Sequence, residues 1–113
     1  MDVRANVSYL PISAQKMRLV CDQVRGMDAE EALAVLQFMP HKGAYLLRKL
    51  IESALANAEE NFELNRQDMF IKDLQANEGP RQYRYKAGAR GRYKPRVKQS
   101  THVSVILREY EEE

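Results

Sequence analysis

The stretch from Arg81 to Lys98 is the feature that most limits how this chain can fold. It carries eight basic side chains and no acidic one. These are Arg81, Arg84, Lys86, Arg90, Arg92, Lys94, Arg96 and Lys98. The rest of the 113-residue chain has ten bases against sixteen acids, so the formal net charge of +2 hides a strong separation of charge. A segment this basic has no place in a hydrophobic core, and it becomes ordered most easily when a polyanion neutralises it.

The remaining sequence has the composition expected of a single intracellular globular domain. Hydrophobic residues make up 44% and charged residues 30% of the chain, which is ordinary for such a domain. No apolar run approaches the length of a membrane span, and residues 1–10 lack the features of a signal peptide. The single cysteine, Cys21, lies between Val20 and Val24 on the apolar side of a predicted helix. A buried structural thiol is a better interpretation there than a nucleophile.

Hydrophobic periodicity predicts three strands and three helices. Apolar and polar residues alternate, as they do in strands with one buried face, over 3–9, less regularly over 69–76, and over 101–107. Apolar residues recur at the helical period from Ser13 to Gly26, from Asp28 to Pro40, and from about His41 to Asn61. The predicted order is therefore one strand, three helices and two strands.

Two of the predicted helices begin with capping signals. Ser13 is placed to cap the first helix, and Ile12 to pack against Met17 as a hydrophobic staple. Asp28 and Glu31 have the spacing of a capping box at the start of the second helix.

The last two strands most simply pair as an antiparallel hairpin, because they are consecutive and the basic stretch lies between them. The predicted fold class is α+β, with three helices packed on a small three-stranded antiparallel sheet. Each arm of the hairpin would span about 37 Å if extended, whereas a compact domain of this size has a radius of gyration of roughly 13 Å. The hairpin should therefore protrude. We expect one domain, 1–113, with a body (1–77 and 99–108), a basic hairpin (78–98) and an acidic tail (109–113).

The composition of the hairpin points to RNA. Tyr83, Tyr85 and Tyr93 are interleaved with the cations, and tyrosine rings stack on unpaired bases while cations bind phosphates. A disordered basic loop or a nuclear localisation patch is the less specific interpretation of such a cluster. The flanking strands argue against it, and Pro80 and Pro95 stiffen the two arms.

Short motifs along nearly the whole chain resemble a known family. They are Ser13-Ala14-Gln15-Lys16 with Arg18-Leu19 and Arg25-Gly26, Ser53-Ala54-Leu55-Ala56-Asn57-Ala58-Glu59 with Asn61, Glu78-Gly79-Pro80, Gly91-Arg92, and Thr101-His102-Val103. Their order and spacing resemble bacterial-type large ribosomal subunit protein number 22.

This resemblance implies a fold and a function. Proteins of that family have an α+β body on the outer surface of the large subunit, near the polypeptide exit, and a long hairpin threaded into the large-subunit rRNA. The hairpin tip lines the nascent-peptide tunnel, and hairpin changes can alter macrolide susceptibility. The implied partners are large-subunit rRNA, neighbouring large-subunit proteins and the nascent polypeptide, with no membrane. The implied location is the cytoplasmic ribosome, although an organelle-encoded ribosomal protein would have the same features.

The candidate rRNA-binding residues fall into three groups. Those of the hairpin are Arg81, Tyr83, Arg84, Tyr85, Lys86, Arg90, Arg92, Tyr93, Lys94, Arg96 and Lys98. Those of the body are Arg4, Lys16, Arg18, Arg25, Lys49 and His102, where His102 is equally well explained as a plain strand histidine. The resemblance places the tunnel-lining tip at Lys86, Ala87, Gly88, Ala89, Arg90, Gly91 and Arg92.

Catalytic chemistry finds no support in the sequence. His41 and His102 are the only histidines, Cys21 has no second cysteine with which to bind a metal, and no glycine-rich phosphate loop follows a strand. We therefore expect no enzyme, no catalytic residue, no metal and no cofactor. Two alternatives use the same basic arm: a free-standing RNA chaperone or regulator, and a module that grips an acidic protein.

Overall fold

The structure is a computed structural model that describes residues 2–79, 82–87 and 93–110, with the backbone alone for 82–87 and 93–98. The elements in chain order are β1 (Asp2–Leu10), α1 (Ala14–Val24), α2 (Ala29–Gln37), α3 (Lys42–Phe62), the 3-10 turn η1 (Arg66–Asp68), β2 (Met69–Glu78), β3 (Gln82–Ala87), β4 (Tyr93–Lys98) and β5 (Thr101–Glu109). Each predicted helix and strand is confirmed, with ends that differ by at most three residues.

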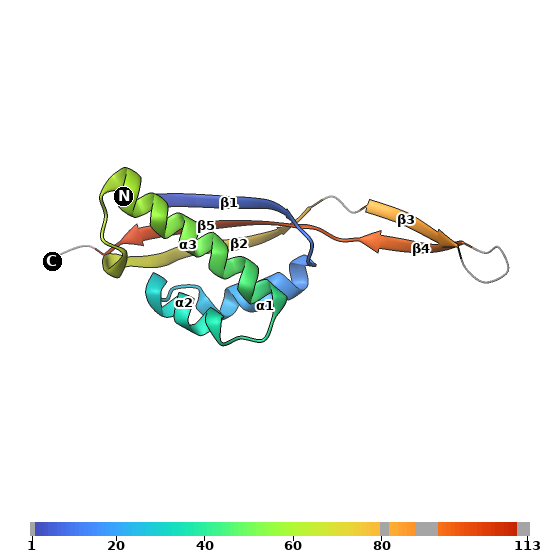
Figure 1. The fold of residues 1–113 in the computed structure, drawn as a ribbon, viewed down its shortest axis with the longest axis horizontal. Helices are drawn as coiled ribbons and strands as arrows, with labels where there is room; N and C mark the ends of the chain where they lie inside the picture. The colour runs from blue at the N-terminus through green and yellow to red at the C-terminus, as the bar shows by residue number, and fades with distance from the viewer. Residues whose placement is uncertain (1, 80–81, 88–92, 111–113) are drawn as a thin grey trace.

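A three-stranded antiparallel sheet in the order β1, β5, β2 forms the centre of the body. The predicted antiparallel pairing of the last two body strands is confirmed, since β2 pairs with β5 from Met69 opposite Glu109 to Glu78 opposite Thr101. The arms β3 and β4 form a second, two-stranded sheet (Figure 1). The predicted α+β class, with three helices and a three-stranded sheet, is thus confirmed.

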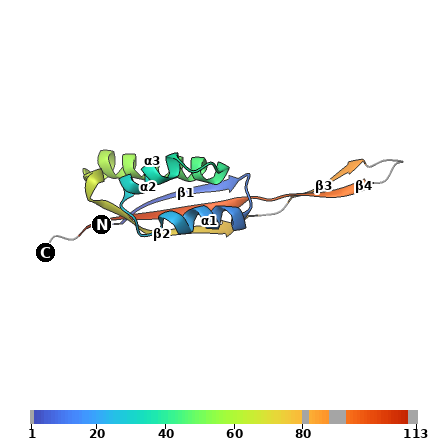
Figure 2. The same ribbon diagram turned by 90° about the horizontal axis from the view of Figure 1, so that it is seen from below.

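The helices cover one face of the sheet, and none of the described helices lies on the opposite face (Figure 2). Alternation along β5 shows why: Val103, Val105 and Leu107 are buried, whereas the intervening residues are partly exposed. Apolar side chains of all three helices complete this core. Burial of these side chains is the main force that holds the body together.

The start of α1 follows its sequence signals. Ser13 is the N-cap, and its side-chain oxygen accepts a hydrogen bond from the backbone N–H of Lys16 at 3.4 Å. The predicted partners Ile12 and Met17 both lie against Gly43 of α3, where an added Cβ would meet them at 3.2 and 3.6 Å. Gly43 therefore lets α3 approach α1 closely, because a Cβ there would press on Ile12 and on Val20, which it would meet at 3.3 Å, and would already touch Met17.

The predicted capping box at α2 is wrong. Asp28 is the N-cap, but its side chain makes no capping hydrogen bond. Instead its Oδ1 accepts a hydrogen bond from the hydroxyl of Tyr110. Tyr110 also donates its backbone N–H to Asp68 O at 2.9 Å and stacks on Phe70 with ring centroids 4.7 Å apart. The carboxylate that the sequence spacing assigned to a local cap is therefore bound by a residue that is distant in the sequence.

The same contacts define the C-terminal end of the body. The sequence assigned residues 109–113 to an acidic tail, yet Glu109 is the last residue of β5 and Tyr110 packs on the body. Residues 111–113 lie outside the described residues.

The molecule is elongated, because β3 and β4 lie beyond the end of the body sheet (Figure 1). Its principal extents are 69 × 25 × 20 Å and its radius of gyration is 17.3 Å. A compact chain of this length would have a radius of gyration of roughly 13 Å. The predicted protrusion of the hairpin is confirmed.

Candidate nucleic-acid interface

The hairpin leaves the body at the ends of β2 and β5. At this root the backbone N–H of Gly79 donates to Ser100 O at 2.9 Å, which keeps the two chain segments together. Thr101, the first residue of β5, is fully buried, and its hydroxyl donates to Ile12 O at 2.5 Å. The root is therefore attached to the segment that leads into α1.

The register of β3 and β4 places different residue types at positions on the two faces of the ladder. Pairs of the β3–β4 ladder are Gln82 with Lys98, Tyr83 with Val97, Arg84 with Arg96, Tyr85 with Pro95, Lys86 with Lys94, and Ala87 with Tyr93. Successive positions of a strand belong to opposite faces. Five of the six positions on one face are cationic, and three of the six on the other are tyrosines. Like charges at directly opposite positions destabilise an isolated ladder, so an anionic partner would stabilise this one.

Part of the predicted site is not covered. Arg81, Gly88, Ala89, Arg90, Gly91 and Arg92 lie outside the described residues. The expected tunnel-lining tip is therefore represented only by the backbone of Lys86 and Ala87, the last two residues of β3.

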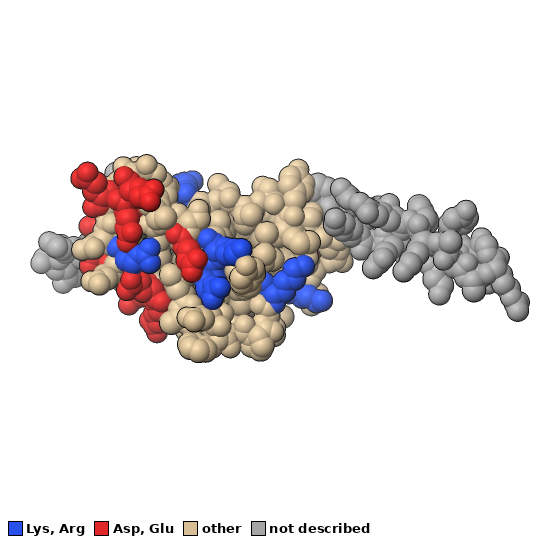
Figure 3. Space-filling view, viewed as in Figure 1, with Lys and Arg blue, Asp and Glu red and all other residues tan. Residues whose placement is uncertain are grey.

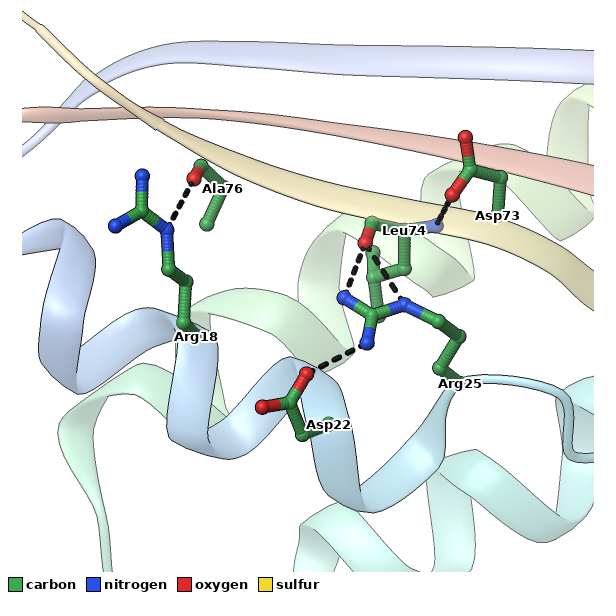
Figure 4. Close-up of polar contacts among 6 residues, drawn as sticks. All are labelled: Arg18, Asp22, Arg25, Asp73, Leu74 and Ala76. Carbon is green, nitrogen blue, oxygen red and sulfur yellow. Dashed lines mark hydrogen bonds and ion pairs between the residues drawn. The ribbon is translucent and has the colours of Figure 1, made fainter.

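Two predicted RNA contacts, Arg18 of α1 and Arg25, the residue that caps its C-terminal end, reach the outer edge of β2 (Figure 4). Nε of Arg18 donates to Ala76 O at 3.0 Å. Nε and Nη2 of Arg25 donate to Leu74 O at 3.2 and 2.7 Å, and Nη1 lies 2.6 Å from Oδ1 of Asp22. All three nitrogens of Arg25 thus have partners within the chain. In Figure 4 the two terminal nitrogens of Arg18 lie on the side of the guanidinium away from Ala76 O.

Lys16 lies on the first turn of α1 and is exposed. It lines an open groove between the start of α1 and the start of α3. Lys42, on the other side of this groove, donates its Nζ to Pro11 O at 3.1 Å. Glu78 lines the groove as well, so its charge is mixed.

The remaining predicted cations of the body, Arg4 and Lys49, lie apart from those of α1. Arg4 is exposed on β1, opposite Ile106, on the sheet face without helices. Lys49 is exposed on α3, with Nζ 4.5 Å from the centroid of the Tyr45 ring. The body cations are therefore spread over both faces of the molecule.

Acidic side chains gather at the end of the body opposite the hairpin (Figure 3). They come from elements that meet there: the C-terminal end of α3, the start of α2 and η1. Among them are Glu59, Glu60, Glu63, Glu30, Glu31 and Asp68. This end of the body is a poor surface for a polyanion.

His102, another predicted RNA contact, binds Tyr9, a residue that the sequence analysis did not select as functional. Its Nδ1 accepts a hydrogen bond from the backbone N–H of Tyr9 at 3.1 Å, and the two rings meet edge to face with centroids 4.8 Å apart. Tyr9 has a positive φ of 59° and is 67% exposed. Tyr9 lies where the register of β1 is irregular, between Val7 and Leu10. The sequence shows a tyrosine at this position, but its alternation with polar neighbours predicted only a strand.

Asp2 and Cys21 are among the described groups whose pKa values are shifted. Hydrogen bonds from Arg108 and the charges of Arg108 and Lys72 lower the pKa of Asp2 to about 2. Burial raises the pKa of the Cys21 thiol to about 11. This shift agrees with the predicted structural thiol, because the side chain is fully buried.

The described side chains include no group of three or more metal-ligating residues. Among the described helices, none combines the length and the apolar run that a membrane span requires.

Comparison with known proteins gives consistent matches over nearly the whole chain. Residues 5–108 match the model of the family described as Ribosomal protein L22p/L17e. Large ribosomal subunit protein uL22 of Finegoldia magna is 43% identical over 111 residues, which cover 98% of this chain and 99% of that protein. The uL22 proteins of Thermomicrobium roseum (43% identity, 99% and 95% covered) and Lacticaseibacillus casei (40%, 95% and 92%) are similar over comparable spans.

Proposed function

Because this chain belongs to the ribosomal protein L22p/L17e family, we propose that it is a structural constituent of the large ribosomal subunit. On this proposal it binds large-subunit rRNA, helps that rRNA to assemble, and works in the cytoplasm as part of the ribosome. The prediction that the chain is not an enzyme agrees with this family membership. The observation that carries the proposal is the family match over residues 5–108.

The shape of the molecule supports this function. A basic hairpin that extends from a compact body along a 69 Å axis suits a segment that passes between RNA elements. Phosphate contacts from its cations would position the protein, and they carry little sequence information of their own. Selectivity for the correct rRNA would then depend on the folded shape of the RNA.

We propose that the whole chain acts as one rRNA-binding domain. The body is formed by 1–77 and 99–108 together with Glu109 and Tyr110, and the hairpin by 78–98. All predicted contact residues of the hairpin are retained in this proposal. In the body, Arg4, Lys16, Lys49 and His102 keep their proposed roles, and Arg18 offers its two terminal nitrogens. Arg25 would contribute mainly by fixing α1 to β2, since its three nitrogens have acceptors within the chain.

The finer functional assignment concerns the tip, Lys86 to Arg92. We propose that it lines the nascent-peptide exit tunnel, where it would contact the nascent polypeptide. Changes there would affect macrolide susceptibility indirectly, by altering the shape of the tunnel. Neighbouring large-subunit proteins are the remaining proposed partners.

Sedimentation tests the ribosomal role. A tagged copy expressed in its own cell should co-migrate with large subunits in a sucrose gradient at high salt, in stoichiometric amount. Digestion of the rRNA should abolish this co-migration. A substoichiometric signal that salt washes into light fractions would favour the RNA chaperone or regulator. Binding that survives ribonuclease would instead favour the module that grips an acidic protein.

A further inference from the structure

The root of the hairpin presents an exposed aromatic ring in an unusual backbone conformation. Tyr9 has a φ of 59°, and bulky residues rarely adopt positive φ, because the side chain crowds the backbone. Such conformations persist where surrounding contacts impose them, and they occur preferentially at functional sites. Here the contact that holds the backbone in this conformation is His102, whose Nδ1 accepts a hydrogen bond from the backbone N–H of Tyr9 at 3.1 Å.

The geometry leaves an aromatic face open. The rings of Tyr9 and His102 are nearly perpendicular, at 88°. In an edge-to-face pair at most one face of each ring is used, so at least one face of Tyr9 is not covered by His102. The residue is 67% exposed. A flat partner can therefore stack on this ring without displacing the pair.

We propose that Tyr9, held at the hairpin root by His102, is a stacking platform for an unpaired base of RNA. The inference rests on the proposed function and extends it to a residue outside the predicted contact set. Aromatic side chains commonly bind single-stranded nucleotides in this way, since every base has a π-face.

The neighbourhood favours RNA over a protein partner. On the sheet face without helices, the rows nearest the root contain Asn6, Ser104 and Gln75, then His102 and Asn77. Amides and hydroxyls of this kind can bond base edges and the RNA 2′-OH. Glu78, also at the root, is opposite Thr101 and lines the groove on the helix-covered side. The chain then continues directly into the basic stretch that begins at Arg81.

A tryptophan reporter provides the direct test. The chain contains no tryptophan, so Tyr9→Trp introduces a single fluorophore at the site. Phe62→Trp is the matched control, because Phe62 is also exposed but ends α3 at the acidic end of the body. A large-subunit rRNA transcript added to each full-length variant should quench the fluorescence of the first and leave the second unchanged. Equal responses would overturn the proposal.

Binding measurements separate stacking from other roles of Tyr9. Tyr9→Gly removes the ring and suits the positive φ, so the fold is kept, as circular dichroism can verify. Affinity for the transcript should fall by about 5- to 150-fold for Tyr9→Gly, with an unchanged salt slope because no phosphate contact is lost. Tyr9→Phe should bind like the unsubstituted chain. Unchanged binding by Tyr9→Gly, or equal loss in Tyr9→Phe, would exclude stacking while the proposed function stood. Failure of the unsubstituted chain to bind would overturn both.

Discussion

Arg25 donates two hydrogen bonds to a single backbone oxygen, that of Leu74, 49 residues away in the chain. Together with the bond from Arg18 to Ala76 O, this contact satisfies carbonyls on the outer edge of β2. Ile71 on that edge bonds with Gly26 and Met27, but beyond this point no described strand pairs with it, because β2 is the last strand of the sheet. An unpaired edge invites pairing with another chain. Arg18 and Arg25 therefore fasten α1 to β2 and also occupy a surface that could otherwise promote aggregation.

Replacement of Arg25 with lysine tests this contact. A single ammonium cannot reproduce three directed bonds to Leu74 O and Asp22. We expect the free energy of unfolding to fall by about 1–2 kcal/mol, measured by urea denaturation. Arg4→Lys, on an exposed position of β1, is the control and should change it by less than about 0.5 kcal/mol. Equal effects of the two substitutions would contradict the role assigned to Arg25.

Acid should weaken the pairing of β1 with the C-terminal end of β5. Arg108 Nε donates to Asp2 Oδ1 at 2.7 Å, and the pKa of Asp2 is lowered from 3.8 to about 2. A lowered pKa in the folded state stabilises the fold above the ordinary value of 3.8, and this contribution is lost as pH falls from 3.8 towards 2. Thermal melts of Asp2→Asn should therefore lie below those of the unsubstituted protein at neutral pH and converge with them near pH 2. For the control Glu60→Gln, on α3, we expect no such convergence.

Cys21 should be inert in the folded protein. Its side chain is fully buried and its pKa is raised to about 11, so very little thiolate exists at neutral pH. Iodoacetamide should label it in denaturant and leave it almost unlabelled in native buffer, as intact mass would show. Rapid stoichiometric labelling of the folded chain would mean that this part of the core opens readily.

Gly79 should be intolerant of a side chain. A Cβ at this position would lie 2.5 Å from Ser100 Oγ and 3.2 Å from His102 Nε2. Gly79→Ala should cost roughly 1 kcal/mol of folding free energy, in the range usual for mild overpacking. The double variant Gly79→Ala with Ser100→Ala should recover part of that loss, because the nearest atom is removed. A double variant whose loss equals the sum of the two single losses would show that the contact with Ser100 is not responsible.

The arm cations should contribute to RNA affinity through phosphate. We expect the triple replacement of Arg84, Arg92 and Arg96 by alanine to leave the circular dichroism of the body unchanged and to weaken binding to a large-subunit rRNA transcript. The slope of log affinity against log salt should become shallower by about 2 to 3, because about one condensed counterion is released per phosphate contact. Unchanged affinity would remove the arms from the mechanism.

Local sequence rules predicted the elements of this fold well, because its helices and strands each have one clearly apolar side. The pairing of β2 with β5 followed from their succession along the chain. Tertiary contacts were harder to predict. Asp28 had a plausible local role as a cap, yet Tyr110, 82 residues later, took its carboxylate. Competition between a local and a distant partner cannot be judged from spacing alone.

The candidate RNA-binding site was likewise predictable in its residue types but not in its tertiary contacts. Cationic residue types were evident in the sequence, but Arg25 proved to be engaged within the chain and Arg18 partly so. Apart from the Asp22 carboxylate, their acceptors are backbone oxygens, which carry no sequence signal. The role of Tyr9 depends on an irregularity in the β1 register and on His102, 93 residues away. Neither could be recognised from the residues around Tyr9.

The acidic end of the body and the basic sequence of the hairpin together make the molecule an electric dipole along its longest axis. In the field of a polyanion such a molecule experiences a torque as well as an attraction. Rotation would turn the hairpin towards the RNA and the cluster around Glu59, Glu60 and Glu63 away from it before contact occurs. Electrostatic orientation of this kind speeds productive encounters and is weakened by salt. The charges on the acidic end would therefore influence how quickly and in which direction the protein arrives, even without touching RNA.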